Sequence, residues 1–512
     1  MYSEPHVLYN NNTRLTSQSL SRSKMLVHFV TLSFVLSSVL PLRRFGQPLV
    51  PPQVSGPLPD AQWFTQVLDH NNVRDLRTWK QRYWVSWEHF QAGGPALIMI
   101  GGEGEENPAW LRAGALAEYG EQYGAAMFIL EHRYYGQSRP TQDLSVKNLT
   151  WLSSHQALAD LAGFIEGMSA QHNITGPWIA IGGSYPGSLA GWLRLKYPHL
   201  VAGSVATSGP VFAKPDFHEY LEVVETALKA ESESCSTAVS TALAKIEFLT
   251  AHRVGWSMLT KMFNLCKPFT GLDKADTATL VETLIGNIET IVQYNKDRKE
   301  FEGGKWGNIT TRIICNIMED RKAGSELQQF AQVNSLSLKM ADTECLDVDY
   351  NNKVAMLRNT KFEDPSSRVP GDVGNRPWFY QTCTEFGWYQ SSSQKGHPFG
   401  ATFPVEFFVK MCSDVFGPKF NTDMLSRGID ITNREYGSLN ISVTNVVFVH
   451  GSLDPWHTLG VTTDLSSDAP AILIDGTSHC SNLYPSSPDD SQALKDARKR
   501  IGELIGLWVK GN

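Results

Sequence analysis

Short apolar runs alternate with segments of helical spacing along the first half of the chain. Runs of four or five apolar residues that end in glycine or polar residues are typical of buried strands, and they occur within 95–104, 126–136, 178–187 and 201–208. Apolar residues spaced three and four apart predict helices near 108–123, over 154–170 and after residue 187. Two aromatic segments of alternating character predict further strands at 63–67 and 78–85. Buried strands that alternate with helices predict a largely parallel sheet covered on both faces.

Beyond residue 212 this pattern stops, and it returns only near residue 443. Between these points the spacing is mainly helical over 213–300, and 350–400 is predicted to be loop because Pro, Gly, Ser and Asn are frequent there. The elements predicted after the interruption are two strands and a final helix, at 443–451, 471–475 and 491–508. The chain therefore predicts one α/β sheet in two parts with a helical, cap-like insertion; the predicted bounds are 60–212, 213–424 and 425–512.

A serine stands at the junction of one predicted strand and the helix that follows it. The segment Trp-Ile-Ala-Ile-Gly-Gly-Ser-Tyr-Pro-Gly runs from residue 178 to 187 and places Ser184 directly after the strand. A serine on a sharp strand-to-helix turn is the nucleophile elbow of serine hydrolases. Gly182 fits the G-x-S-x-G pattern, whereas Pro186 stands where the second glycine is expected and Gly187 follows one place later. We predict that Ser184 is a nucleophile.

A serine hydroxyl needs a base that takes its proton, usually a histidine held by a carboxylate. In α/β-hydrolases the acid and the histidine follow the serine in that order. Each late predicted strand is followed by one suitable residue, Asp454 after the first and His479 after the second. Asp475 is a rival acid, but it ends the same strand that precedes the histidine; His457 is a rival base, but it shares a loop with Asp454. We predict the triad Ser184, Asp454 and His479.

Acyl transfer also needs hydrogen-bond donors for the developing oxyanion. One donor is usually the backbone N–H after the nucleophile, here that of Tyr185. The second comes from the loop after an earlier strand, which here reads Gly-Gly-Glu-Gly at 101–104. We nominate the N–H of Gly102 or of Glu103. The proposed chemistry needs no metal and no organic cofactor.

The N-terminus carries a targeting signal. Residues 25–42 are dominated by Leu, Val and Phe behind the basic residues Arg22 and Lys24, which suits a secretory signal peptide. Residues 1–45 are therefore predicted to be an extension and signal, with Met25 as an alternative start. A retained signal anchor is the competing interpretation, because the run is barely long enough to span a membrane. After removal of the signal we expect no stable membrane insertion.

If the chain enters the secretory pathway, its cysteines predict disulfides and its Asn-x-Ser/Thr patterns predict glycosylation sites. Six of the seven cysteines lie between residues 235 and 412, and disulfides are their expected state, with Cys480 as the odd thiol. Which cysteines pair stays open. No Cys-x-x-Cys pair suggests a metal site. The predicted glycosylation sites are Asn148, Asn173, Asn308 and Asn440.

Charge and composition exclude one class of partner. The chain of 512 residues has 52 acidic and 45 basic residues and a net charge of −7, which argues against a nucleic-acid-binding protein. Hydrophobic residues make up 42% and aromatic residues 11%, enough for a large core. The mild acidity is compatible with an acidic compartment.

Several motifs, in order from about Trp63 to the C-terminus, resemble one family of secreted and lysosomal serine peptidases. This family includes lysosomal Pro-X carboxypeptidase, dipeptidyl peptidase II and thymus-specific serine protease. The motifs are Gln-Val-Leu-Asp-His at 66–70, Glu-His-Arg-Tyr-Tyr-Gly at 131–136, Gln-Ala-Leu-Ala-Asp-Leu at 156–161, Gly-Gly-Ser-Tyr at 182–185 and Gly-Ser-Leu-Asp-Pro-Trp at 451–456. The sequence around Ser184 and the stretch 380–390 look closest to the thymus-specific branch. Pro186 departs from the small residue common at that place.

The resemblance implies an α/β-hydrolase domain with a helical cap over the active site, the triad named above and peptide substrates, with cleavage after proline in two branches. Its expected pocket is aromatic, and we single out Trp378 and Trp456, together with Phe379, Trp388 and Tyr389. The expected location is the secretory pathway, in lysosomes or endosomes or outside the cell, and a homodimer is left open. The alternatives are a lipase or esterase on the same fold, and a catalytically inactive peptide-binding relative.

Overall fold

The computed structural model describes residues 51–295, 309–362, 374–394 and 396–511. The predicted extension and signal at 1–45 and the glycosylation site Asn308 lie outside the described residues. Among the described helices, none is both long and apolar enough to cross a membrane.

An eight-stranded mixed sheet organises the chain on both sides of the insertion. In spatial order its strands are β1 (Gln62–Val67), β2 (Thr78–Ser86), β4 (Ala126–Leu130), β3 (Ala96–Ile100), β5 (Trp178–Gly183), β6 (Val201–Thr207), β9 (Val446–Gly451) and β10 (Ala471–Ile474). β2 pairs antiparallel with both β1 and β4, and every other pair is parallel. Parallel strands put their carboxyl ends at one edge, where loops can gather into a site. This arrangement is the α/β-hydrolase fold that the sequence predicts.

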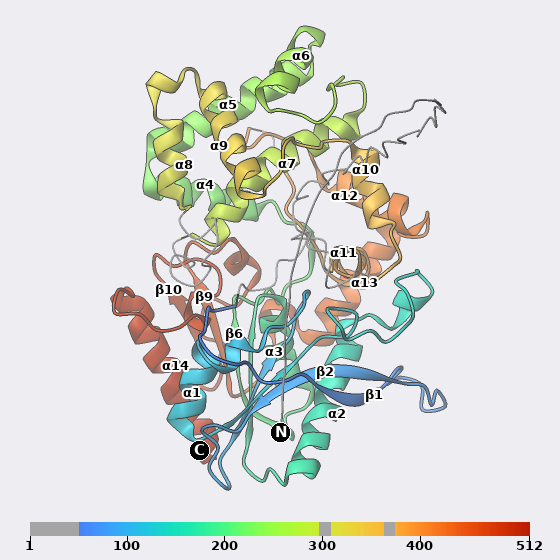
Figure 1. Cartoon of the computed structure of the whole chain (residues 1–512), viewed down its shortest axis with the longest axis vertical. Coiled ribbons are helices and arrows are strands. Elements are labelled where there is room, and N and C mark those ends of the chain that lie inside the picture. Colours follow the sequence, from blue (N-terminus) through green and yellow to red (C-terminus); the bar gives the residue numbers. More distant parts are fainter. Residues whose placement is uncertain (1–50, 296–308, 363–373, 395, 512) are drawn as a thin grey trace, which may run out of the picture. The chain divides into compact units, whose positions relative to one another are not determined.

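Helices cover both faces of the sheet, as the continuous apolar runs require. The side chains of β3, β4, β5 and β9 alternate between two hydrophobic cores. Helices α2 (Ser154–His172) and α3 (Tyr185–Lys196) pack in one core, and α1 (Ala115–Tyr123) and α14 (Gln492–Lys510) pack in the other (Figure 1). Serine side chains cap two of these helices: Ser153 accepts a hydrogen bond from Gln156 N, and Ser491 accepts one from Leu494 N.

The segment between β6 and β9 is mainly helical (Figure 1). Its longest elements are α4 (Glu219–Glu231), α5 (Glu233–Thr250), α7 (Lys274–Gln293), α9 (Glu326–Met340), α12 (Val405–Phe416) and α13 (Thr422–Tyr436). Shorter helices are α6 (Arg253–Met262), α8 (Thr311–Met318), α10 (Tyr350–Leu357) and α11 (Asn375–Gln381), and a small two-stranded sheet joins β7 (Lys214–Asp216) to β8 (Gly387–Tyr389). The domain bounds themselves stay a prediction.

Three disulfides lie within this helical segment. They join Cys235 to Cys315, Cys266 to Cys345 and Cys383 to Cys412. Cys480 is a free, buried thiol. The prediction that the six cysteines between 235 and 412 are oxidised and that Cys480 is the odd one is confirmed.

Two predictions about secondary structure were wrong. The stretch 350–400, predicted to be loop, contains α10, α11 and a π-helical turn over Thr382–Phe386. Tyr350, Val354 and Leu357 form a buried helical stripe there, so tertiary packing outweighs the frequent Asn and Pro. The helix predicted near 108–123 is divided into a 3₁₀ turn at Pro108–Leu111 and α1, because Gly114 at φ 94° breaks the helical backbone between them.

Gly203 and Gly191 provide a matched test of packing at the sheet. A Cβ on Gly203 would lie 2.3 Å from the indole of Trp508, whereas one on Gly191 in α3 would lie 3.5 Å from Phe448. We expect Gly203→Ala to lower stability by about 1–3 kcal/mol, because α14 must shift. Gly191→Ala should be neutral or stabilising by up to about 1 kcal/mol. Thermal unfolding of both variants checks this, and an equal loss in the two would contradict it.

Candidate active site

The turn between β5 and α3 holds Ser184 in a strained conformation. Its backbone φ is 68°, a left-handed value that costs a non-glycine residue about 1–3 kcal/mol. The neighbouring glycines allow this turn: a Cβ on Gly182 would lie 2.0 Å from the carbonyl oxygen of Pro186, and one on Gly187 would lie 2.2 Å from that of Thr207. Ser184 N donates to Thr207 O at 3.0 Å, which fixes the turn against β6. The side chain of Ser184 is half-buried and lines a cavity.

Pro186 fits this elbow. It stands in the first turn of α3, where the missing N–H has no partner within the helix to lose. Its ring packs against the backbone of Gly102, where an added Cβ would lie 2.6 Å from the proline Cγ. Pro186 thus joins the elbow to the loop after β3, and that loop has room for it only because residue 102 is glycine.

Asp454 and His479 meet as a buried pair. His479 Nδ1 lies 3.0 Å from both carboxylate oxygens of Asp454, and both side chains have no exposed surface. Asp454 also accepts the N–H of Trp456 at 3.0 Å, while the backbone N–H of His479 donates to the carbonyl of Gln293 at 2.9 Å. A second contact therefore holds the carboxylate of Asp454, and another holds the backbone of His479. Among the described residues, His479 Nε2 has no hydrogen-bond partner, so this nitrogen is available to a proton donor.

Each member of the pair shifts the pKa of the other. Burial acts to lower the pKa of His479, but Asp454, through its charge and hydrogen bond, and the neighbouring Cys480 oppose it and leave the pKa well above its ordinary value. Burial likewise acts to raise the pKa of Asp454, and His479 more than offsets this, so that the pKa is lowered. The histidine is consequently a stronger base than an isolated imidazole.

The two rival residues make other contacts. Asp475 is exposed, and Ser452 Oγ donates to its Oδ1 at 3.2 Å. His457 Nδ1 lies 2.7 Å from the backbone carbonyl of Asp454, not from its carboxylate. Of the two candidate bases, it is the ring of His479 that contacts the carboxylate of Asp454.

Ser184 and His479 are near one cavity but are not hydrogen bonded to each other within the described chain. The rings of Tyr294 and Trp456 lie 5.7 and 6.5 Å from the imidazole, and both residues line the cavity that Ser184 lines. The structure thus joins Asp454 and His479 directly and places Ser184 at a cavity that two neighbours of His479 also line.

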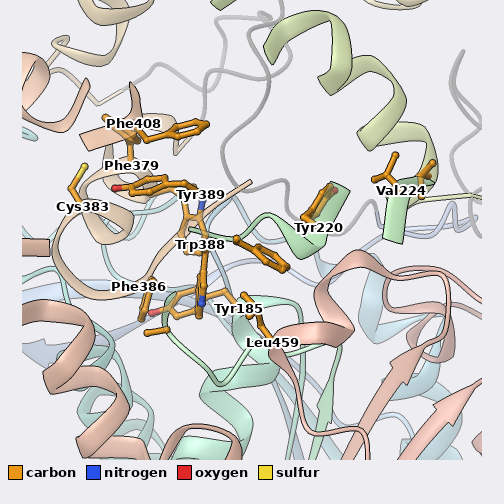
Figure 2. Close-up of a cluster of buried hydrophobic side chains, with 14 of the residues drawn as sticks. Tyr185, Tyr220, Val224, Phe379, Cys383, Phe386, Trp388, Tyr389, Phe408 and Leu459 are labelled. Atoms are coloured by element: carbon orange, nitrogen blue, oxygen red, sulfur yellow. The ribbon is translucent and has the colours of Figure 1, made fainter. Parts of the chain in front are cut away.

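The cavity beside Ser184 has an empty volume of about 540 Å³ and is largely aromatic. The predicted residues Trp378 and Trp456 line it, as do Trp388, Tyr185, Tyr220 and Tyr294. Phe379 and Tyr389 do not line it; they stack on Phe416 and Phe408 in the core. Figure 2 shows Phe379, Tyr389 and Phe408 together, apart from Tyr185 and Tyr220. These two rings had the same sequence signal as the tryptophans, and only packing separates them.

The two nominated oxyanion donors differ in their surroundings. The N–H of Tyr185 begins α3 directly after Ser184, whereas the N–H of Gly102 donates to Glu106 Oε1 at 3.1 Å. Burial raises the pKa of Glu106 to about 8 and that of Glu103 to about 7. Gly102 therefore has to exchange a carboxyl partner for the oxyanion if it serves as the second donor.

A buried polar network that the sequence did not reveal fixes Tyr185. Burial lowers the pKa of His132 to about 4, so the ring is neutral; its Nδ1 lies 2.7 Å from the carbonyl of Arg133 and must donate to it. His132 Nε2 is then the acceptor for the Tyr185 hydroxyl at 3.1 Å. Gln381 donates to the same hydroxyl at 3.1 Å and accepts from Tyr135 at 2.6 Å. This network fixes the side chain of the residue whose backbone N–H is nominated as an oxyanion donor.

Three of the predicted glycosylation sites lie in the described chain. Asn173 and Asn440 are exposed, and Asn148 is half-buried with its amide donating to Asp143. All three stay predictions.

A strained serine at a strand-to-helix turn, above a parallel sheet with a buried Asp–His pair, defines an α/β-hydrolase of the serine type. The sequence model of the serine carboxypeptidase S28 family matches residues 66–501. Thymus-specific serine protease of Mus musculus is 35% identical over 468 residues, with 89% of this chain and 88% of that protein covered. Lysosomal Pro-X carboxypeptidase of Mus musculus is 29% identical over 519 residues, with 95% and 98% covered.

Among solved structures, a proline iminopeptidase of Mycobacterium smegmatis matches 85% of this chain and 96% of its own length, at 12% identity and a TM-score of 0.33. The family match spans most of the chain, and so does the relative at 35% identity. The chain belongs to the serine carboxypeptidase S28 family and is a serine peptidase.

The Asp–His pair predicts the pH dependence of activity. A raised pKa keeps His479 protonated to higher pH, and the protonated ring cannot accept the serine proton; kcat/KM should therefore be low in acid and rise through a midpoint above the ordinary histidine value of about 6.5. Asp454→Asn should move this midpoint to lower pH and reduce kcat by about 10³- to 10⁴-fold. Steady-state kinetics from pH 4 to 9 check this, and an unmoved midpoint in the variant would contradict it.

Proposed function

We propose that this peptidase uses Ser184, His479 and Asp454 as a catalytic triad and works through an acyl-enzyme. The observation that carries the proposal is the buried Asp454–His479 pair, whose imidazole ring lies near Tyr294 and Trp456, two residues that line the cavity of Ser184. Catalytic hydrogen bonds are often long or absent before substrate binds, so the unjoined state is compatible with this role.

In the first step His479 Nε2 accepts the proton of Ser184 Oγ while the oxygen attacks the carbonyl carbon of a peptide bond. The carbonyl oxygen becomes an oxyanion and accepts the N–H of Tyr185 and a second N–H from the loop after β3. Asp454 holds the imidazole in the required tautomer and stabilises the imidazolium. His479 then gives the proton to the leaving amine. In the second step His479 accepts a proton from water, whose oxygen attacks the acyl carbon, and returns that proton to Ser184 Oγ as the bond between the acyl group and Ser184 breaks.

The proposed substrates are peptides, cleaved from an end and with a preference for those that contain proline. Two features support this: the walls of the cavity carry three tryptophans on which an apolar ring can pack, and one of the similar proteins is named a Pro-X carboxypeptidase. We place the enzyme in the secretory pathway, in lysosomes or outside the cell, because its three disulfides require an oxidising compartment during folding.

Covalent labelling tests the nucleophile. We expect a fluorophosphonate probe to label the wild-type enzyme and to leave Ser184→Ala unlabelled and inactive, with at least about a 10³-fold loss of peptide hydrolysis, because the attacking oxygen is gone. Ser335→Ala, at an exposed position of α9, is the matched control and should label fully.

Persistent labelling of the Ser184→Ala variant would show that another serine reacts. An unlabelled wild-type enzyme would favour the inactive peptide-binding relative, and turnover of acyl esters without peptides would favour the esterase.

A further inference from the structure

One buried hydroxyl lies between the two loops that carry the acid and the base of the proposed triad. Ser208 directly follows β6 and is 1% exposed. Its Oγ accepts the backbone N–H of Cys480, the residue after His479, at 2.9 Å. A hydroxyl has one hydrogen and two lone pairs, so this contact leaves the hydrogen of Ser208 free for an acceptor.

The carboxylate of Asp454 is that acceptor. An ionised carboxylate can only accept a hydrogen bond, so the Ser208 hydroxyl donates to it. Burial acts to raise the pKa of Asp454, whereas His479 and the charge of His450 act to lower it. The hydrogen bond from Ser208 lowers this pKa further. With His479 Nδ1 at 3.0 Å and the N–H of Trp456 at 3.0 Å, the carboxylate has three hydrogen-bond donors that fix its orientation.

The backbone of Ser208 is strained and firmly bound. Its φ is 50°, a left-handed value that is uncommon for residues other than glycine. Ser208 N donates to Val449 O at 2.6 Å, which binds this turn to the neighbouring strand β9. A strained backbone at such a place is grounds for a functional hypothesis. Glycine would adopt the same conformation without steric cost, but it would have no hydroxyl.

Other hydrogen bonds hold the two loops as well. Leu453 N donates to Thr477 O at 2.9 Å and so joins one loop to the other. Asn482 Nδ2 donates to Thr207 Oγ1 at the end of β6, also at 2.9 Å. The loops should therefore stay attached to each other and to the sheet when the hydroxyl of Ser208 is removed. Its removal takes away the bridge between the carboxylate of the acid and the backbone beside the base.

We propose that Ser208 is a positioning residue of the triad, whose hydroxyl joins the carboxylate of Asp454 to the loop of His479 and keeps carboxylate and imidazole aligned. The inference rests on the proposed triad and adds a fourth side chain on which its geometry depends. The described residues that line the cavity of Ser184 do not include Ser208, so we expect this residue to act through Asp454 and not on the substrate. Ser208 takes no part in the transfer of protons.

Two substitutions remove the hydroxyl and differ in the backbone freedom that they leave. Ser208→Ala and Ser208→Gly should each lower kcat for a proline-containing peptide about 10- to 100-fold, the range for a charged group that loses one hydrogen bond, and change KM by no more than about twofold. Ser204→Ala is the matched control, because Ser204 is a buried residue of β6 whose Oγ has no hydrogen-bond partner in the described chain. This control should keep the wild-type kcat. Thermal unfolding and fluorophosphonate labelling of Ser184 report whether each variant is folded.

A double-mutant cycle shows whether Ser208 acts through Asp454. In Asp454→Asn the charge that Ser208 orients is already gone, so the further change Ser208→Ala should lower kcat by less than about threefold. A residue that only supports the fold would lower kcat by the same factor in both backgrounds. The values of kcat for the wild type, the two single variants and the double variant, measured with one fluorogenic peptide, give the coupling between the two side chains.

The outcomes separate the inference from the function on which it rests. Wild-type kcat in both Ser208 variants, an effect on KM alone, or a loss with alanine but not with glycine would overturn the role of the hydroxyl and leave the triad standing. An equal loss in both backgrounds of the cycle, or failure of both Ser208 variants to fold, would show a purely structural role and overturn it too. If Ser184 does not label and Asp454→Asn keeps its activity, the triad itself is refuted, and the role of Ser208 is refuted with it.

Discussion

The end of β6 holds the site together through hydrogen bonds to three separate parts of the chain. Thr207 O accepts the N–H of Ser184 at 3.0 Å, Ser208 N donates to Val449 O at 2.6 Å, and Ser208 Oγ accepts the N–H of Cys480 at 2.9 Å. Two adjacent residues, Thr207 and Ser208, thus bind the turn of Ser184, the strand before Asp454 and the loop of His479. Because β6 is a central strand of the sheet, this junction cannot move without disturbing the core. The relative positions of the three proposed catalytic residues follow from it.

The helical insertion takes part in the site as well as covering it. The C-terminal end of α7 supplies the carbonyl of Gln293 to the backbone of His479, and the Gln293 side chain accepts hydrogen bonds from Tyr220 at 2.7 Å and Trp456 at 3.1 Å. One residue of α7 therefore contacts the histidine loop, the loop after Asp454 and helix α4. The three disulfides constrain the unfolded state of this insertion, and such bonds typically contribute about 2–4 kcal/mol each. Helix α7 thus places a backbone carbonyl beside His479 from a distant part of the chain.

Three acidic side chains gather where the loops after β3 and β4 meet. Glu103, Glu106 and Glu131 all have raised pKa values, with burial as the main cause, and Arg82 is the cation that pairs with Glu131. Glu106 bonds to the N–H of Gly102, and the N–H of Glu106 donates to Glu131 at 3.2 Å. This chain of contacts shapes the loop beside Ser184 and places carboxyl groups with raised pKa values near the cavity.

The sequence by itself determined the sheet strands, the covering helices, the cysteines that are oxidised and the candidate triad. The spacing of apolar residues, the glycines at a strained turn and the order of residues after each strand can all be read locally along the chain. Tertiary structure alone decided which aromatic residues line the cavity: Trp378 and Phe379 are adjacent in sequence, yet one faces the site and the other stacks in the core. It also decided that Gly102 already has a carboxyl partner, and that Glu289 and Gln293 approach the site from a helix more than a hundred residues away from Ser184. Contacts between distant segments depend on how whole elements pack, and no local pattern of residues encodes them.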